Sequence, residues 1–257
     1  MASTFLNGPI LVSVAFIMTL GMALMLMVVV ALAPVFGSPP GGQAFVDMAG
    51  VKLAFLEPLL GIALFYAFGE AVIHRHTLAT ALEKEVSAAR TLAWSIDHAN
   101  PSRRSTAHAA LNDYLFAVTE REWPAMARAG ESPEAVAALI RLNASIGALD
   151  AVVDDHAWAR RARMMVRAMG EQRDFRLARS SLRLSSVITA TAATVIILLT
   201  GFVWILGAAD FRPRFVMTLL LYTAILSVFI GVVILYNPFI GDWALSPEPF
   251  MQIRDRA

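Results

Sequence analysis

Two carboxylates, Glu57 and Glu70, stand inside a long apolar stretch of the sequence. A charged side chain within a membrane-spanning segment is costly, so it usually faces a protein interior or water and marks a pathway. Glu57 either lines a pore, or pairs with Lys52 at the outer membrane interface, or lies protected between helices. Glu70 lies toward the other end, where it either contributes to an ion pathway or reaches the interface and pairs with an arginine.

Four arginines follow one another at helical spacing just before another apolar stretch. They are Arg173, Arg176, Arg179 and Arg183. A basic concave surface raises the local concentration of anions, so these side chains could line a vestibule. The alternative is that they fix the orientation of the protein by contacting acidic lipid headgroups.

Other chemistry has little support in this sequence. The chain has no cysteine, which excludes disulfides, thiol catalysis and zinc–thiolate sites. Its five histidines do not fall at the spacing of a metal site. Phosphate-binding loops and nucleophile motifs are missing, and the basic region lacks the interleaved aromatic residues of a nucleic-acid-binding surface. We therefore expect neither an enzyme nor a metal, cofactor or nucleic-acid partner.

The elements that must position the candidate residues are apolar helices. Hydrophobic residues make up 58% of the 257 residues and charged residues only 16%, whereas about a quarter of a soluble domain is charged. A helix needs about 20 apolar residues to cross a membrane. Runs of that length cover residues 9–36, 45–73, 184–209 and 215–236. The sequence therefore predicts an all-α polytopic membrane protein with four transmembrane helices.

The charges are distributed unevenly, which predicts the orientation. Of the 21 Lys and Arg residues, 16 lie between Arg75 and Arg183, and positive residues mark the cytosolic side. Both termini should then be cytosolic. The predicted regions are a transmembrane hairpin at 1–74, a helical cytosolic domain at 75–183, a second hairpin at 184–236 and a cytosolic tail at 237–257.

Breaker and cap residues divide the cytosolic domain into helices. The motif Asn100-Pro101-Ser102 should end the helix that follows the second span, and the next helix should stop near Trp123-Pro124. Ser132 is placed to cap a new helix with Pro133 at its first position. The last helix should begin near Asp155, run toward Leu184 and continue into the third span.

The second span has unusual residues in its middle. Gly61 permits close helix contact or leaves room along a pore. The bulky Phe65 and Tyr66 follow it. An aromatic side chain repeated around an oligomer axis could form a hydrophobic constriction that controls ion flow. The alternative is ordinary packing against lipid or neighbouring helices.

Several motifs together resemble a known family. The fourth span is followed by Asn237-Pro238-Phe239-Ile240-Gly241-Asp242, and the cytosolic domain contains Glu85-Val86, Glu122-Trp123-Pro124 and Arg173-Asp174-Phe175-Arg176. Their order and their spacing relative to the spans, from Gly69 to Pro249, resemble the bestrophin-like domain family. This is a group of bacterial membrane proteins distantly related to bestrophin ion channels.

The resemblance implies a homo-oligomeric channel, pentameric as in bestrophins, that conducts small inorganic ions across the bacterial inner membrane. Its second span would line the pore through Glu57, Gly61 and Phe65. The family pattern has apolar or aromatic residues at these positions, so Glu57 and Gly61 depart from it, and a ring of Glu57 carboxylates would favour cations. Of the acidic calcium-binding run of animal bestrophins only Asp242 remains, so calcium gating is not implied.

A different class of function is also compatible with the sequence. The protein could be a non-conducting membrane scaffold or accessory subunit that binds a partner through its cytosolic helices. Ionic flux would distinguish the two classes.

Overall fold

The computed structural model contains helices and connecting turns. The residues that it describes are 27, 42–98, 101–128, 130–150, 156–182, 211–241 and 243–255. Within these residues there is no strand, which confirms the expected all-α class. The predicted spans at 9–36 and 184–209 lie outside the described residues, apart from Met27.

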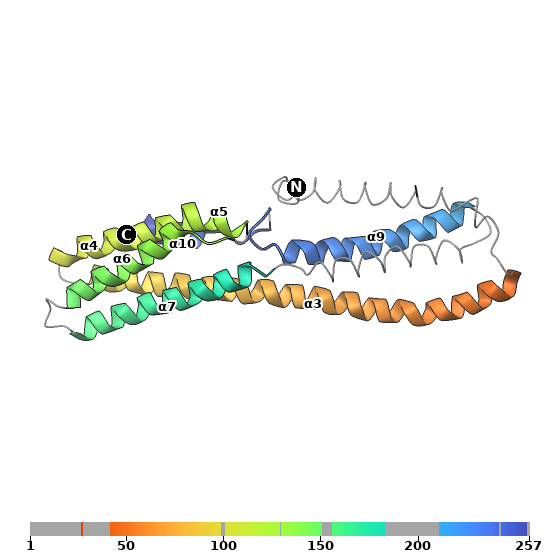
Figure 1. Cartoon of the computed structure of the whole chain (residues 1–257), viewed down its shortest axis with the longest axis horizontal. Helices are drawn as coiled ribbons and strands as arrows, with labels where there is room; N and C mark the ends of the chain where they lie inside the picture. Colours follow the sequence, from red (N-terminus) through yellow and green to blue (C-terminus); the bar gives the residue numbers. More distant parts are fainter. Residues whose placement is uncertain are drawn as a thin grey trace. The chain divides into compact units, whose positions relative to one another are not determined.

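The chain divides into two compact units. The first comprises Met1–Ile73 and Leu184–Tyr236, and the second comprises His74–Arg183 and Asn237–Ala257. Helix α3, Gly42–Asp97, is a single helix of 56 residues that belongs to both units (Figure 1). The helix predicted from Arg75 onward is therefore a continuation of the helix that contains residues 45–73, the predicted second span.

Helix α9, Phe211–Leu235, is the other described helix of the first unit. Its segment Phe215–Leu235 is the one described stretch that is long and apolar enough to cross a membrane, with 21 residues. This stretch coincides with the predicted fourth span. A methyl group added at Gly231 would lie 3.3 Å from Cε2 of Phe68 on α3. The glycine therefore allows these two helices to pack closely.

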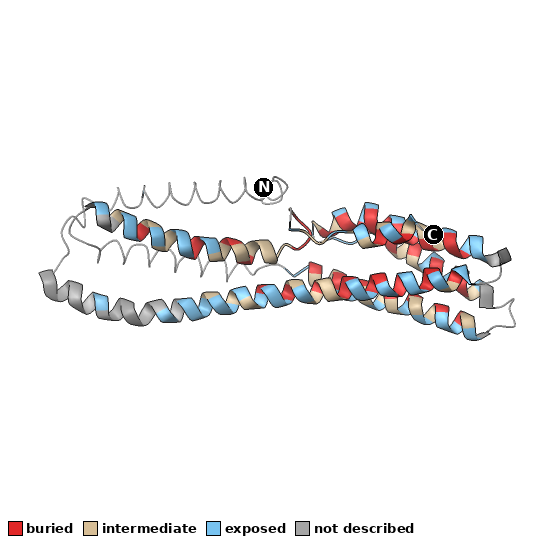
Figure 2. Ribbon diagram, turned by 180° about the vertical axis from the view of Figure 1, so that it is seen from behind, coloured by how far each residue is buried: buried red, intermediate tan, exposed pale blue. Residues whose placement is uncertain are grey.

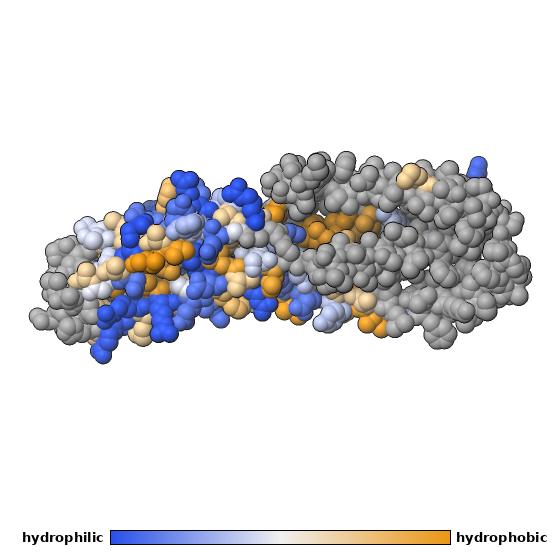
Figure 3. Space-filling view, in the orientation of Figure 1, coloured by the Kyte–Doolittle hydropathy of each residue, from blue (hydrophilic) through white to orange (hydrophobic). Residues whose placement is uncertain are grey.

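The second unit contains the remaining helices around the His74–Asp97 part of α3. They are α4 (Pro101–Ala117), the π-helical turn η1 (Val118–Glu122), α5 (Trp123–Met126), α6 (Pro133–Asp150), α7 (His156–Ser180) and α10 (Glu248–Arg254). Helix α6 packs against both α4 and α7. The helices bury a shared apolar core (Figure 2), while hydrophilic side chains cover much of the face seen in Figure 3.

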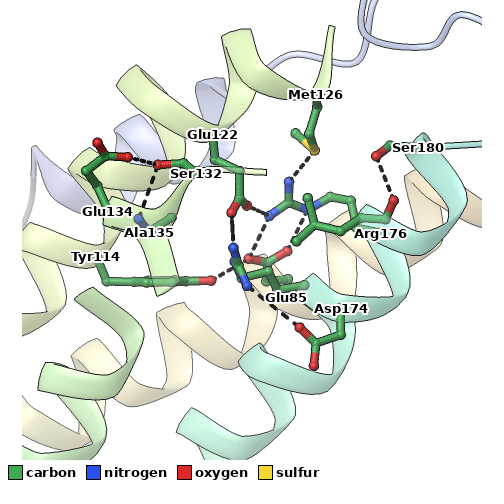
Figure 4. Close-up of polar contacts among 12 residues, drawn as sticks. Glu85, Tyr114, Glu122, Met126, Ser132, Glu134, Ala135, Asp174, Arg176 and Ser180 are labelled. Carbon is green, nitrogen blue, oxygen red and sulfur yellow. Dashed lines mark hydrogen bonds and ion pairs between the residues drawn. The ribbon is translucent and has the colours of Figure 1, made fainter. Parts of the chain in front are cut away.

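The start of α6 is confirmed as predicted. Helix α6 begins at Pro133, and the Ala135 N–H donates a hydrogen bond to Oγ of Ser132 at 3.3 Å. The Ser132 hydroxyl in turn donates to the Glu134 carboxylate at 2.6 Å. Both contacts are visible in Figure 4. A side-chain oxygen at this position satisfies one of the donors that a helix leaves free at its N-terminus.

The predicted stop near Trp123-Pro124 is a widened turn rather than an interruption. The Trp123 N–H donates to the carbonyl of Val118, five residues earlier, and α5 continues to Met126. Pro124 has no N–H, and its ring clashes with the carbonyl four residues before it in a regular helix. The π-turn accommodates the proline and resets which side chains face the core. Glu122, at its end, is buried.

The C-terminal end of α7 corrects one expectation. The helix ends at Ser180, so it does not continue into the third span as predicted. The hydroxyls of Ser180 and Ser181 donate to the carbonyls of Leu177 and Ala178, at 2.9 and 2.8 Å. Consecutive serines that bond to their own backbone compete with the helical pattern, so they favour a break here.

Candidate functional site

The strongest polar constellation lies in the core of the second unit and is centred on Arg176 (Figure 4). Its Nε donates to the Glu85 carboxylate at 2.9 Å, and one terminal nitrogen donates to Glu85 at 3.2 Å and to Glu122 at 2.8 Å. The other terminal nitrogen contacts the sulfur of Met126 at 2.8 Å. The guanidinium thus joins α3, η1, α5 and α7.

Two further side chains complete this buried network. Arg173 donates from Nε to the Glu122 carboxylate at 2.8 Å, and a second of its nitrogens contacts the same oxygen. The Tyr114 hydroxyl on α4 donates to Glu85 at 2.8 Å. All of these side chains are buried. Two guanidiniums face two carboxylates, so their formal charges balance, which a buried charge requires.

The surroundings change the acidity of two network members. Burial alone lowers the pKa of the Arg176 guanidinium, but the Glu85 and Glu122 carboxylates outweigh this effect, and the net direction is upward. Burial raises the pKa of the Tyr114 hydroxyl well above 10, and the Glu85 carboxylate raises it further. Arg176 therefore stays charged and Tyr114 stays protonated across the physiological range.

Trp123 connects the network to the C-terminal tail. The Arg176 guanidinium lies 5.3 Å from the centre of the Trp123 ring, within the range of a cation–π interaction. The Phe239 and Phe250 rings meet the same indole edge to face, at 5.5 and 6.2 Å between ring centres. Its N–H donates to the carbonyl of Leu245 at 3.0 Å. The tail is thereby built into the core of the second unit.

This arrangement is suited to holding helices together rather than to catalysis. The Arg176 guanidinium uses all three of its nitrogens within the network, and both carboxylates accept from more than one donor. No nucleophile with a free base stands among these residues. Within the described ranges, no group of three or more His, Asp or Glu side chains gathers as a metal site would.

The candidate pore residues lie on α3 in the first unit. Gly61 and Phe65 are exposed, four residues apart, and therefore on the same side of the helix. Glu57 lies one turn before Gly61, but its side chain is outside the described part. Glu70 is also exposed. Bulky side chains thus stand uncovered on this part of α3.

The candidate vestibule arginines have a different environment from the one expected. Arg173 and Arg176 are 3% and 0% exposed and are paired with carboxylates, so neither offers a free charge on the surface. We assign them a structural role in the network. Arg183 lies outside the described residues.

The tail motif forms a closed loop next to Trp123. The Ile240 N–H donates to the carbonyl of Asn237 at 3.2 Å, and the Leu245 N–H donates to that of Pro238 at 2.7 Å. Gly241 has a φ of 85°, which only glycine adopts readily, so its place in the motif has a conformational reason. Asp242, the last residue of the motif, lies outside the described residues.

Sequence reasoning did not identify Glu85, Glu122 and Tyr114 as partners of the arginines. A signal for Glu85 is nevertheless present. It occupies a core position of the apolar stripe on α3, whose buried members are Leu78, Leu82, Glu85, Ala89, Leu92 and Ile96. A charge at such a position predicts a buried partner. The π-turn that buries Glu122 has no comparable pattern.

The described residues define an all-helical protein with one apolar helix long enough to span a membrane and a helical unit held together by a buried ion network. The family of the Bestrophin-like domain matches residues 22–250, so the chain belongs to the bestrophin-like family. This confirms the resemblance seen in the sequence. The family consists of membrane proteins. No curated protein is recognisably similar in sequence.

Solved structures share the fold at low sequence identity. A crystal structure of a membrane protein that carries a proline-to-alanine change has a TM-score of 0.67 and 13% identity, covering 94% of this chain and 96% of that chain. A point mutant of a bacterial bestrophin homologue from Klebsiella pneumoniae, with a tyrosine changed to alanine, has a TM-score of 0.60 and 14% identity, with the same coverage. The likeness therefore extends over nearly the whole of both chains.

The network predicts a large cost for removing one carboxylate. Glu122→Gln leaves two buried guanidiniums with one buried carboxylate, because Arg173 keeps only its 3.7 Å contact with the exposed Asp174. We expect the free energy of unfolding to fall by about 3–5 kcal/mol, because an uncompensated buried charge is strongly destabilising. Denaturant unfolding of the purified protein in detergent, followed by tryptophan fluorescence, measures this change.

The matched control is Glu171→Gln, which disrupts the exposed pair between Glu171 and Arg167 at 2.8 Å and should change stability little. The double variant Glu122→Gln/Arg173→Gln rebalances the charge and should recover part of the loss. Equal, small effects of Glu122→Gln and Glu171→Gln would contradict the conclusion that the buried network holds these helices together.

The raised pKa of Tyr114 predicts a pH dependence. In the unfolded chain a tyrosine loses its proton near pH 10, whereas the folded protein retains the Tyr114 proton to higher pH. The stability from this difference is complete below about pH 10 and is lost as the pH rises toward the folded pKa. Tyr114→Phe should be about 1.5–3 kcal/mol less stable at neutral pH, because the lost hydrogen bond is made to a charged carboxylate. Unfolding free energies measured from neutral to alkaline pH should then fall less steeply for this variant, and parallel curves would contradict the prediction.

Proposed function

We propose that this protein is a homo-oligomeric, bestrophin-like ion channel in which the second span lines the pore. Known members of the bestrophin-like family are ion channels, which supports the proposal. A channel also needs no catalytic constellation, in agreement with the structural character of the buried network. Five subunits are proposed by resemblance to bestrophins.

The observation that carries the proposal is the uncovered face of α3 in the first unit. Ile62, Phe65 and Tyr66 are 67, 78 and 72% exposed within the single chain. Side chains of this size on a membrane helix require lipid, another subunit or a pore axis beside them. Repetition of the chain around an axis would supply the last two at once, with Gly61 and Phe65 toward the neck of the pore.

The proposed topology follows the apolar runs and the charges. Residues 9–36, 45–73, 184–209 and 215–236 cross the inner membrane, and both termini lie in the cytosol together with residues 75–183 and 237–257. Glu57 lies near the outer mouth of the pore, and Glu70 lies on the ion pathway near the cytosolic end. Membrane lipid and small inorganic ions are the proposed partners.

Reconstitution into planar bilayers, with class averages viewed down the membrane normal, tests the proposal as a whole. Ionic currents and an axial path lined by the second span would support it. A strict monomer, or an oligomer with no such path, would contradict it. A stoichiometric protein partner without ionic flux would favour a membrane scaffold instead.

A narrower prediction concerns Phe65. If its ring constricts the pore, Phe65→Ala widens an apolar neck that impedes hydrated ions, and the single-channel or macroscopic current should rise severalfold. Leu220→Ala is the matched control, because Leu220 is 65% exposed and belongs to α9 rather than to the proposed pore helix. Equal currents of both variants and the unmodified protein would exclude Phe65 from the constriction.

A substitution at Glu57 tests the ion selectivity of the proposed channel. A ring of carboxylates attracts cations, so Glu57→Gln should lower the cation-to-anion permeability ratio by at least about twofold. Reversal potentials under a KCl gradient measure that ratio. Glu83→Gln is the control, since Glu83 is an exposed carboxylate on α3 beyond the predicted span. An unchanged reversal potential in Glu57→Gln would place this carboxylate off the ion path.

A further inference from the structure

Trp243 is an exposed aromatic residue in the C-terminal tail. Its exposed fraction is 67%, whereas Phe239 and Ile240, a few residues earlier, are each only 8% exposed. Tryptophan is large and apolar apart from one N–H group, so leaving it in water forfeits a considerable favourable contribution. An exposed ring of this kind suits an environment that accepts an apolar group with one polar edge.

Two backbone hydrogen bonds close the loop that holds Trp243. The Leu245 N–H donates to the Pro238 carbonyl at 2.7 Å, and the Ala244 N–H donates to the Gly241 carbonyl at 3.0 Å. Leu245 also accepts the hydrogen bond from the Trp123 indole. Because both ends of the loop are held in this way, the outward orientation of Trp243 is a property of the folded tail.

Chain connectivity places this loop close to the end of the apolar helix α9. Helix α9 ends at Leu235, and the loop begins at Pro238, three residues later. Three residues of extended chain span at most about 10 Å. The headgroup zone on each side of a bilayer is about 5–7 Å deep. Since the closing hydrogen bond keeps Trp243 near Pro238, its indole is within reach of that zone.

We propose that Trp243 is an interfacial anchor that inserts into the lipid headgroup region at the cytosolic end of α9. Tryptophan is enriched at this level because its ring is apolar and its N–H can bond to headgroup oxygens or water. The anchor ties the loop, and through Trp123 the core of the second unit, to the membrane surface. The proposal rests on membrane insertion of α9 and does not depend on whether the protein conducts ions.

The absence of cysteine makes the test direct, because a single cysteine can be introduced and labelled without background. Trp243→Cys carries a fluorophore in vesicles of anionic and zwitterionic phospholipid that contain lipids with a quenching nitroxide near the headgroup. Trp94→Cys is the matched control. Trp94 is 63% exposed and lies 21 residues beyond Ile73 on α3, about 30 Å along the helix.

The expected result is a clear loss of fluorescence by nitroxide lipid at position 243 and none at position 94. Two results would overturn the proposal. Equal accessibility of both labels to an aqueous quencher, with no lipid quenching, would place Trp243 in water. Shielding from the aqueous quencher without lipid quenching would show that a second copy of the chain or another protein covers it. Separate measurements of ionic flux distinguish failure of the anchor from failure of the channel proposal.

Discussion

The guanidinium of Arg176 is the point on which the second unit depends. It is fully buried. An isolated charge in such a place would cost more free energy than the net free energy of unfolding of a typical domain. Only the simultaneous presence of Glu85 on α3 and Glu122 on η1 makes the position tolerable. Replacing such a network with apolar residues can be neutral or stabilising. The network also constrains the helix register, because the charged groups meet in one register only.

Trp123 extends this constraint to the tail. Its ring lies against Arg176 on one side and against Phe239 and Phe250 on another, so the tail motif and the ion network share one residue. The π-turn that precedes Pro124 sets the direction of both Glu122 and Trp123. A change at this turn would consequently disturb both the buried ion network and the packing of the tail. Short motifs far apart in the sequence are thus parts of one packing arrangement.

Much of the fold was predictable because local chemistry determines it. The Ser132 cap, the break before Pro101 and the apolar stripes are encoded within a few neighbouring residues, and the structure has them. The partners in the buried ion network were harder to predict from the sequence. Arg176 and Glu85 are 91 residues apart, and a single sequence shows which positions are buried but not which partners meet. Local patterning likewise predicted that α7 would continue, whereas consecutive serines end it at Ser180.

Helix α3 shows two opposite burial patterns along its length. In its second-unit part, large apolar side chains such as Leu78 and Leu92 are buried and Lys84 is exposed. In its first-unit part the small Ala71 is buried, while Phe65 and Tyr66 face outward. Water favours the first pattern, whereas lipid tolerates bulky apolar groups on the outside and small residues at helix contacts. This change of burial pattern near Ile73 agrees with the proposed boundary of the second span and does not depend on family membership.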